Sequence, residues 1–465
     1  MLEFGTNDDI TLIIDRFENT LQNNKHQYFD VEEFTEIIEY YIDNFEYSNA
    51  LNAIRYAFNQ HPNSYEILIR QSEVYVLTNK ADNAIKILSS LGSTNYDIEL
   101  LKASAYLITG NIELYNKHIK FCINEGTEQT FDSIYKIAIS FISTNKWHEV
   151  AIKFLLQSFK ISNRNTFVLN DIAIAYERLN NHKKAIEYYN KYINTDPFDE
   201  TAWFNLAAAY ENTLNYDKAI ESYEFAITIN IKYQPAYLNI ASIHIVNENF
   251  DKAIGVYEEL LNHTNYKHEV YCLIGECYER ISSYDNAYSN YTKALKINDK
   301  FADAWFGLAM VKYETEEFSE SLYFIKRALL LDEDNEEYHF ELGNINYKLD
   351  SFADSIKSYK RAISINPIDA EFSYTLSDLY YKLNDIDAAI EILLKSEIHI
   401  KDRAEIKYRL AFYYAFTNNI DASKRYFEEA LKIDNSIFED ILENFSEIQI
   451  SKTIKEFIKK QNNNE

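Results

Sequence analysis

The chain has 465 residues, and its 73 acidic and 46 basic residues give a formal net charge of −27. A surface of this sign repels phosphate groups, which argues against a nucleic-acid-binding protein and against binding to an anionic membrane. No apolar stretch is long enough to span a bilayer, so we expect no membrane insertion, and the start of the chain lacks a secretory pattern. Three cysteines are too few for a disulfide framework, so we expect a cytoplasmic protein.

Few residues in this chain interrupt regular structure. Glycine occurs 8 times and proline 4 times, which predicts long helices joined by short turns. The first 30 residues form a lead-in, in which residues 8–23 are predicted to be helical. The abundance of asparagine, isoleucine, lysine and tyrosine suggests a low-GC bacterial source.

From residue 31 one pattern returns at intervals of 34 residues, with one residue missing in the second unit. We call the first residue of each unit offset one. Twelve units cover 31–437, and they start at 31, 65, 98, 132, 166, 200, 234, 268, 302, 336, 370 and 404. The array is predicted to continue into a C-terminal capping helix and tail at 438–465.

Two offsets hold small side chains in almost every unit. Offset twenty departs from alanine or serine only at Lys117, and offset eight departs from a small residue only at Ile38 and Ile139. Small residues allow two helices to approach closely. Offset eight holds Ser72, Ala105, Ala173, Ala207, Ala241, Gly275, Ala309, Gly343, Ser377 and Ala411, and offset twenty holds Ala50, Ala84, Ala151, Ala185, Ala219, Ala253, Ala287, Ser321, Ser355, Ala389 and Ser423.

Each unit contains two apolar stripes at helical spacing. In the unit from 200, the break "NTLNYDK" separates the stripes, and Asp217 is predicted to cap the second helix. Each unit is therefore predicted to be a helical hairpin, and the chain to be an all-α stack of hairpins.

The pattern resembles the tetratricopeptide repeat. The unit from 200 supplies the family's motif residues Trp203, Leu206, Ala207, Tyr210, Ala219, Tyr223 and Ala226, and the unit from 336 adds Leu342, Gly343, Tyr359, Ala362 and Pro367. The resemblance implies a right-handed superhelical solenoid of helix-turn-helix units. It is weakest at 98–131, where Lys117, Gly110 and Gly126 occur and where we expect irregular packing.

No arrangement of residues in the sequence supports catalysis, a metal or a cofactor. The glycines are isolated from one another, so no phosphate-binding loop is present. His148 starts a string like a zinc-binding helix, but Lys153 and not a second histidine follows its apolar residues. Cys272 and Cys277 are five residues apart and do not share a helix face, so we expect buried structural thiols.

The resemblance also implies that first helices line a groove, with offsets two, five, six, nine, twelve and thirteen facing it. Side-chain amides there suit the backbone of an extended peptide, and exposed aromatic residues are favoured binding anchors. An asparagine at offset six is also common in the family's consensus, and aromatic stripes are usually core. The candidate peptide-binding residues are Asn170, Asn205, Asn239, Asn344, Phe204, Leu238, Phe306, Phe340, Tyr374 and Tyr408, of which the last six, at offset five, are expected to be partly exposed.

A basic partner is one hypothesis, because the groove offsets of the first two units are rich in glutamate. These residues are Glu32, Glu36, Glu39, Glu66 and Glu73, against Arg70. The sequence thus predicts a non-enzymatic scaffold or adaptor that binds a protein or an extended peptide. A peptide-responsive regulatory receptor and an enzyme with an unrecognised site are the alternatives, and the oligomeric state stays open.

Overall fold

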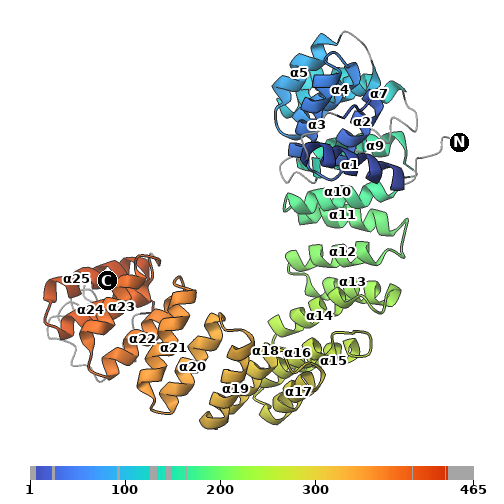
Figure 1. Cartoon of the computed structure of the whole chain (residues 1–465). Coiled ribbons are helices and arrows are strands. Elements are labelled where there is room, and N and C mark those ends of the chain that lie inside the picture. The colour runs from blue at the N-terminus through green and yellow to red at the C-terminus, as the bar shows by residue number, and fades with distance from the viewer. Residues whose placement is uncertain are drawn as a thin grey trace, which may run out of the picture. The chain divides into compact units, whose positions relative to one another are not determined.

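The computed structural model describes residues 7–22, 27–91, 95–125, 134–135, 137–139, 141–142, 148–163, 165–400, 402–434 and 436–437. Every regular element in these ranges is an α-helix (Figure 1). The chain divides into two compact units, Met1–Ala236 and Tyr237–Glu465. The predicted capping helix at 438–465 lies outside the described residues.

The first unit begins with the expected lead-in helix, α1, which is confirmed to within one residue. Antiparallel pairs of helices follow, each joined by a short turn. The helices are α1 (Asn7–Gln22), α2 (Val31–Asp43), α3 (Tyr47–Gln60), α4 (Tyr65–Leu77), α5 (Ala81–Ser90), α6 (Tyr96–Ile108), α7 (Ile112–Glu125), α9 (His148–Ile161), α10 (Phe167–Arg178), α11 (His182–Ile193), α12 (Glu200–Asn212) and α13 (Tyr216–Ile229).

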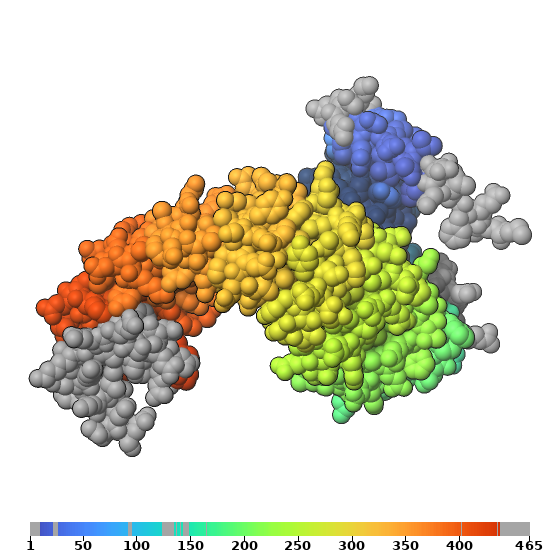
Figure 2. Space-filling model, turned by 90° about the horizontal axis from the view of Figure 1, so that it is seen from below, coloured from blue at the N-terminus to red at the C-terminus, as the bar shows by residue number. Residues whose placement is uncertain are grey.

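The second unit continues the alternation of first and second helices in chain order (Figure 1). In Figure 2 the residues of this unit, from yellow to red, form a continuous row of packed side chains. Its helices are α14 (Gln234–Val246), which crosses the boundary between the units, α15 (Phe250–Leu260), α16 (Lys267–Arg280), α17 (Tyr284–Ile297), α18 (Ala302–Glu314), α19 (Phe318–Leu331), α20 (Glu336–Lys348), α21 (Phe352–Ile365), α22 (Ala370–Lys382), α23 (Ile386–Ser396), α24 (Ala404–Phe416) and α25 (Ile420–Ile433).

The small residues at offsets eight and twenty lie where the two helices of a hairpin cross. All eleven alanines and serines at offset twenty are buried. In three hairpins the serine hydroxyl crosses to the first helix and donates to the carbonyl oxygen of offset eight at 2.8 Å. These bonds join Ser321 to Ala309, Ser355 to Gly343 and Ser423 to Ala411. The predicted steric rule is confirmed, because only a short side chain permits this approach.

A left-handed residue ends the first helix of each regular hairpin. Leu214 has φ 58°, its amide donates to the carbonyl of Glu211, and the amide of Asn215 donates to the carbonyl of Tyr210. This pair of bonds satisfies carbonyl groups that the helix end would otherwise leave free. The same position has a positive φ at Phe45, Asn79, Gly110, Asn180, Glu248, Ser282, Glu316, Asp350, Asn384 and Asn418.

Two local predictions were wrong. Asp217 does not cap α13, because Asn215 occupies the cap position and Asp217 lies in the first turn. There its carboxylate still favours the positive end of the helix dipole. The unit predicted to start at 98 has a first helix that begins at Tyr96, two residues earlier. Offset twenty therefore falls on Tyr115, which is buried, while Lys117 is exposed.

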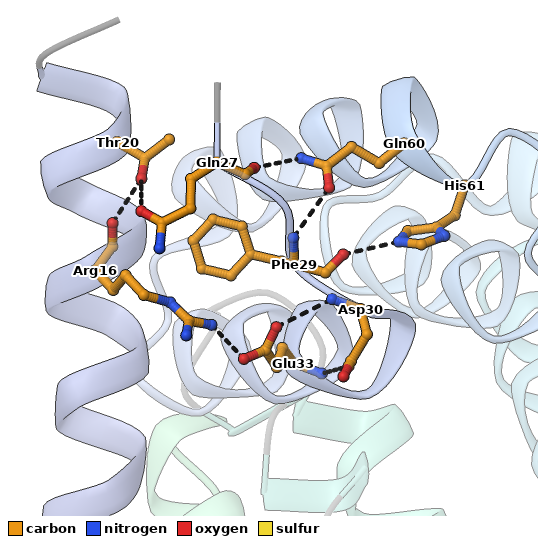
Figure 3. A network of polar contacts seen from close by, with 8 residues as sticks. All are labelled: Arg16, Thr20, Gln27, Phe29, Asp30, Glu33, Gln60 and His61. Carbon is orange, nitrogen blue, oxygen red and sulfur yellow. Dashed lines mark hydrogen bonds and ion pairs between the residues drawn. The ribbon is translucent and has the colours of Figure 1, made fainter. Parts of the chain in front are cut away.

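Polar contacts attach α1 to the first hairpin (Figure 3). Arg16 forms an ion pair with Glu33, and Glu33 with Asp30 forms a reciprocal capping box at the start of α2. Gln60 binds the segment before α2, since its side chain accepts from the amide of Phe29 at 3.0 Å. His61 contacts the carbonyl of Phe29 at 2.8 Å. These bonds hold the buried ring of Phe29 between α1 and α2.

Candidate functional site

A cavity of about 650 Å³ lies in the second unit, between three successive first helices. Helices α16, α18 and α20 form its walls together with part of α17 (Figure 1). Its lining consists of Glu276, Glu279, Arg280, Tyr284, Tyr291, Asp303, Phe306, Gly307, Met310, Glu314, Asn335, Glu337 and Tyr338. Most of these residues occupy the offsets that the resemblance assigns to the groove.

The cavity is strongly acidic, with five carboxyl groups and one guanidinium group, that of Arg280. Within the described part of the chain, none of the five carboxylates forms an ion pair. Burial raises the pKa of Glu279 to about 7, although the hydroxyl of Tyr291 donates to its Oε2 at 2.5 Å. Partial desolvation in the cavity raises the pKa of Glu276, and the negative charge of Asp303 raises it further. A cation from outside would relieve this accumulation of negative charge.

Aromatic residues fix the walls of the cavity. The ring of Tyr291 is buried between Gly275 and Gly307, and a Cβ atom at either glycine would overlap it. The hydroxyl of Tyr338 donates to Asp303 at 2.5 Å, and the ring of Phe306 stacks on Tyr338 with centroids 4.8 Å apart. The shape of the cavity is therefore set by packed rings and not by mobile side chains.

Sequence comparison identifies the repeat. Family models for the tetratricopeptide repeat match residues 168–199, 201–233, 268–301, 340–404 and 404–437. The chain is a tetratricopeptide repeat protein. It thus belongs to a class of repeat proteins that serve as protein-interaction scaffolds. No curated protein matches it.

Solved structures similar to this tetratricopeptide repeat protein cover parts or most of it. MamA is 23% identical, covers 35% of this chain and 94% of its own, and has a TM-score of 0.32. The C-terminal part of a repeat protein from Cytophaga hutchinsonii is 15% identical, covers 51% of this chain and 97% of its own, and has a TM-score of 0.43. The APC/C hetero-tetramer Cut9–Hcn1 is 12% identical, covers 92% of this chain and 97% of its own, and has a TM-score of 0.37. The family assignment rests on the sequence matches.

The six candidates at offset five of this tetratricopeptide repeat protein fall into two groups. Phe306 lines the cavity. Phe204, Leu238 and Tyr374 are half-buried. The expected exposure is wrong for the other two, because Phe340 is 8% exposed and Tyr408 is fully buried.

Both buried rings are covered by other aromatic rings. Phe340 packs against Tyr359 and Phe372. Tyr408 packs against Phe427, and its hydroxyl donates to the carbonyl of Asp434 at 2.9 Å.

The four candidate asparagines are not gathered at one place. Asn344 accepts from the hydroxyl of Tyr359 at 2.6 Å and donates to Glu341 at 3.1 Å, so its amide already has partners. Asn170 and Asn205 lie in the first unit, and Asn239 lies in the second. All four side chains are half-buried. That these four asparagines bind a peptide stays a prediction.

The acidic face expected at the start of the chain is partly neutralised. Arg70 forms ion pairs with Glu39 and, at 2.7 Å, with Glu73. The carboxylates around the cavity were not among the predicted groove residues, which were acidic only in the first two repeats. The signal was present, since Glu276 and Glu279 occupy offsets nine and twelve.

The remaining polar candidates have structural surroundings. Cys272 and Cys277 are free and buried, as expected, and burial raises the pKa of the Cys277 thiol to about 11. His148 is buried at the start of α9. Among the described residues, no three metal-binding side chains come together, and no helix combines the length and apolarity that crossing a bilayer requires.

Proposed function

We propose that this tetratricopeptide repeat protein is a non-enzymatic scaffold or adaptor that holds an extended segment of a protein partner against its first helices. The cavity between α16, α18 and α20 carries the proposal, because consecutive first helices contribute to it from the groove offsets. Its volume of about 650 Å³ is in the usual range of a ligand site, and its lining is more polar than that of most such sites.

The half-buried side chains along the first helices support binding by many modest contacts. Phe306 offers an aromatic anchor in the cavity, and Leu238 and Tyr374 are half-buried at the equivalent offset of other units. Aromatic residues that are partly exposed contribute strongly to protein interfaces. An extended segment would contact several units in turn, so that no single residue would dominate the affinity.

Site-specific photo-crosslinking tests the proposal in the cells that produce the protein. A photoreactive phenylalanine analogue replaces Phe306 in α18, Tyr374 in α22 or, as the matched control, Tyr323 in α19, which is 52% exposed. We expect adducts with a defined protein at position 306 and at Tyr374, and none at position 323. Adducts at position 323 alone would place the interaction on the second helices and contradict the proposal.

A further inference from the structure

One type of contact between neighbouring first helices recurs in this chain. We define the interhelix site as the space between offset nine of one first helix and offset six of the next. Arg70 at offset six of α4 forms an ion pair with Glu39 at offset nine of α2. Arg409 at offset six of α24 pairs with Asp378 at offset nine of α22. The chain thus places a guanidinium group opposite a carboxylate in each of its two compact units, Met1–Ala236 and Tyr237–Glu465.

The site between α22 and α24 shows how completely a guanidinium fills this space. Arg409 is 5% exposed, and its Nε and a terminal nitrogen donate to the two oxygens of Asp378 at 3.0 and 2.9 Å. The guanidinium carbon lies 4.3 Å from the centroid of Tyr374. Bidentate pairing and stacking on a ring are specific to arginine and are not reproduced by lysine.

The site between α16 and α18 has the carboxylate but, at offset six, no cationic side chain opposite it. Four units carry an acidic residue at offset nine: Glu39 and Glu73 pair with Arg70, Asp378 pairs with Arg409, and Glu276 forms no ion pair within the described part of the chain. The residue at offset six opposite Glu276 is Gly307. The ring of Tyr291 occupies the place of a Cβ there, so the chain cannot supply the missing cation from this position.

We infer that the interhelix site between α16 and α18 binds an arginine side chain of a basic partner segment. The guanidinium lies in the cavity beside the carboxylate of Glu276, because the ring of Tyr291 already takes the space next to Gly307. Glu279, Asp303, Glu314 and Glu337 surround the guanidinium and supply further acceptors, and Phe306 supplies a ring in the same cavity, as Tyr374 does for Arg409. This inference rests on the proposed function and names the chemistry of the bound segment.

The test uses the full chain and a fluorescein-labelled dodecapeptide of alternating arginine and serine. The control peptide has citrulline in place of arginine, which keeps the shape of the side chain but removes its charge. Fluorescence anisotropy at about 150 mM salt, where long-range attraction is screened, measures both affinities. We expect the citrulline peptide to bind at least about tenfold more weakly, and equal affinities would overturn the inference.

Two substitutions locate the bound arginine. Glu276→Gln removes the carboxylate, and Met310→Arg places a guanidinium from the chain itself into the cavity; each should weaken binding of the arginine peptide by about tenfold or more. Glu258→Gln on the exposed surface of α15 removes the same charge, and Met310→Leu keeps the side chain at position 310 apolar, so both should bind as the wild type does. Circular dichroism checks that every variant is folded.

The outcomes separate this inference from the proposed function. Weaker binding in both cavity variants with unchanged controls supports the arginine site. If all four variants bind the arginine peptide alike, or if the wild type does not bind it, the inference fails. In those cases the crosslinks at position 306 still decide whether the first helices hold a partner.

Discussion

The interhelix site between α22 and α24 and the one between α16 and α18 have the same place in the repeat and opposite contents. The first is filled by Arg409, which joins two helices through Asp378 and is covered by Tyr374. The second contains Glu276 and a glycine, and it opens into a cavity. The two sites thus differ at offset six, where Arg409 supplies a guanidinium and Gly307 supplies no side chain.

The comparison also explains why the open site does not collapse. Tyr291 reaches across it from α17 and donates to Glu279, so the helices remain apart while the ring takes the volume of a missing side chain. Burial raises the pKa of Glu279, so its ionised form destabilises the open site, whereas Glu276, Asp303, Glu314 and Glu337 are exposed to water.

Removal of the internal guanidinium should have the largest effect on stability. Arg409→Ala leaves the carboxylate of Asp378 without its partner, and the free energy of unfolding should fall by about 2 to 4 kcal/mol, somewhat less than for a fully buried pair. Urea denaturation followed by circular dichroism measures the change. The double variant Arg409→Met with Asp378→Asn removes both charges and should recover much of the loss; a double variant as unstable as Arg409→Ala would show that packing, not charge, is responsible.

Gly307→Ala tests whether Tyr291 excludes a side chain from the open site. The added methyl group overlaps the ring, which is buried, so overpacking should destabilise the protein by about 1 to 3 kcal/mol. Gly255→Ala in α15 is the control, because no atom lies within 4 Å of the added Cβ and helix propensity should make it neutral or stabilising. Equal urea midpoints for the two variants would contradict the role given to Tyr291.

Glu279 should make the open site sensitive to pH. Its pKa is about 7 in the folded protein, against 4.5 for an unperturbed glutamate. Between these values the unfolded chain loses the proton while the folded protein keeps it, so the stability falls as the pH rises from about 4.5 to 7. Tyr291, Glu276, Glu314 and Arg280 are the charged or titratable groups that act on it.

Glu279→Gln cannot ionise and should therefore remove this part of the pH dependence. At pH 8 it should be more stable than the wild type by about 1 kcal/mol, because the side chain is only partly buried. At pH 4.5 the two proteins should denature at the same urea concentration. A constant difference across this range would mean that Glu279 is ionised throughout.

The fold was predictable because its signals are steric and local. Small residues at offsets eight and twenty mark helix crossings within one hairpin, and a helix start can be read from a few neighbouring residues. The register failed at Tyr96, because a helix shifted by two residues placed Tyr115, a large residue, where the pattern required a small one. A constant spacing of 34 residues does not reveal that a helix has shifted by two residues within its repeat.

The candidate site was less predictable because its properties depend on neighbours from other units. Phe340 and Tyr408 occupy the same offset as Phe306, yet both are buried, Phe340 against Tyr359 and Phe372 and Tyr408 against Phe427. Gly307 is merely a small residue in the sequence, and only the position of Tyr291 in space shows why this offset supplies no guanidinium to Glu276. Tyr291 and Gly307 belong to successive repeats, so no single-repeat motif contains their contact.

The interhelix site between α2 and α4 gives the smallest expected effect and the sharpest control for the comparison. Arg70 and Glu39 occupy the same offsets as Arg409 and Asp378, but their side chains are 27% and 35% exposed. Water compensates the carboxylate of Glu39, although Glu73, the second partner of Arg70, is only 12% exposed, so Arg70→Ala should lower the free energy of unfolding by about 1 kcal/mol at most, measured by urea denaturation. A loss as large as that of Arg409→Ala would show that the repeat position, and not burial, determines the strength of the pair.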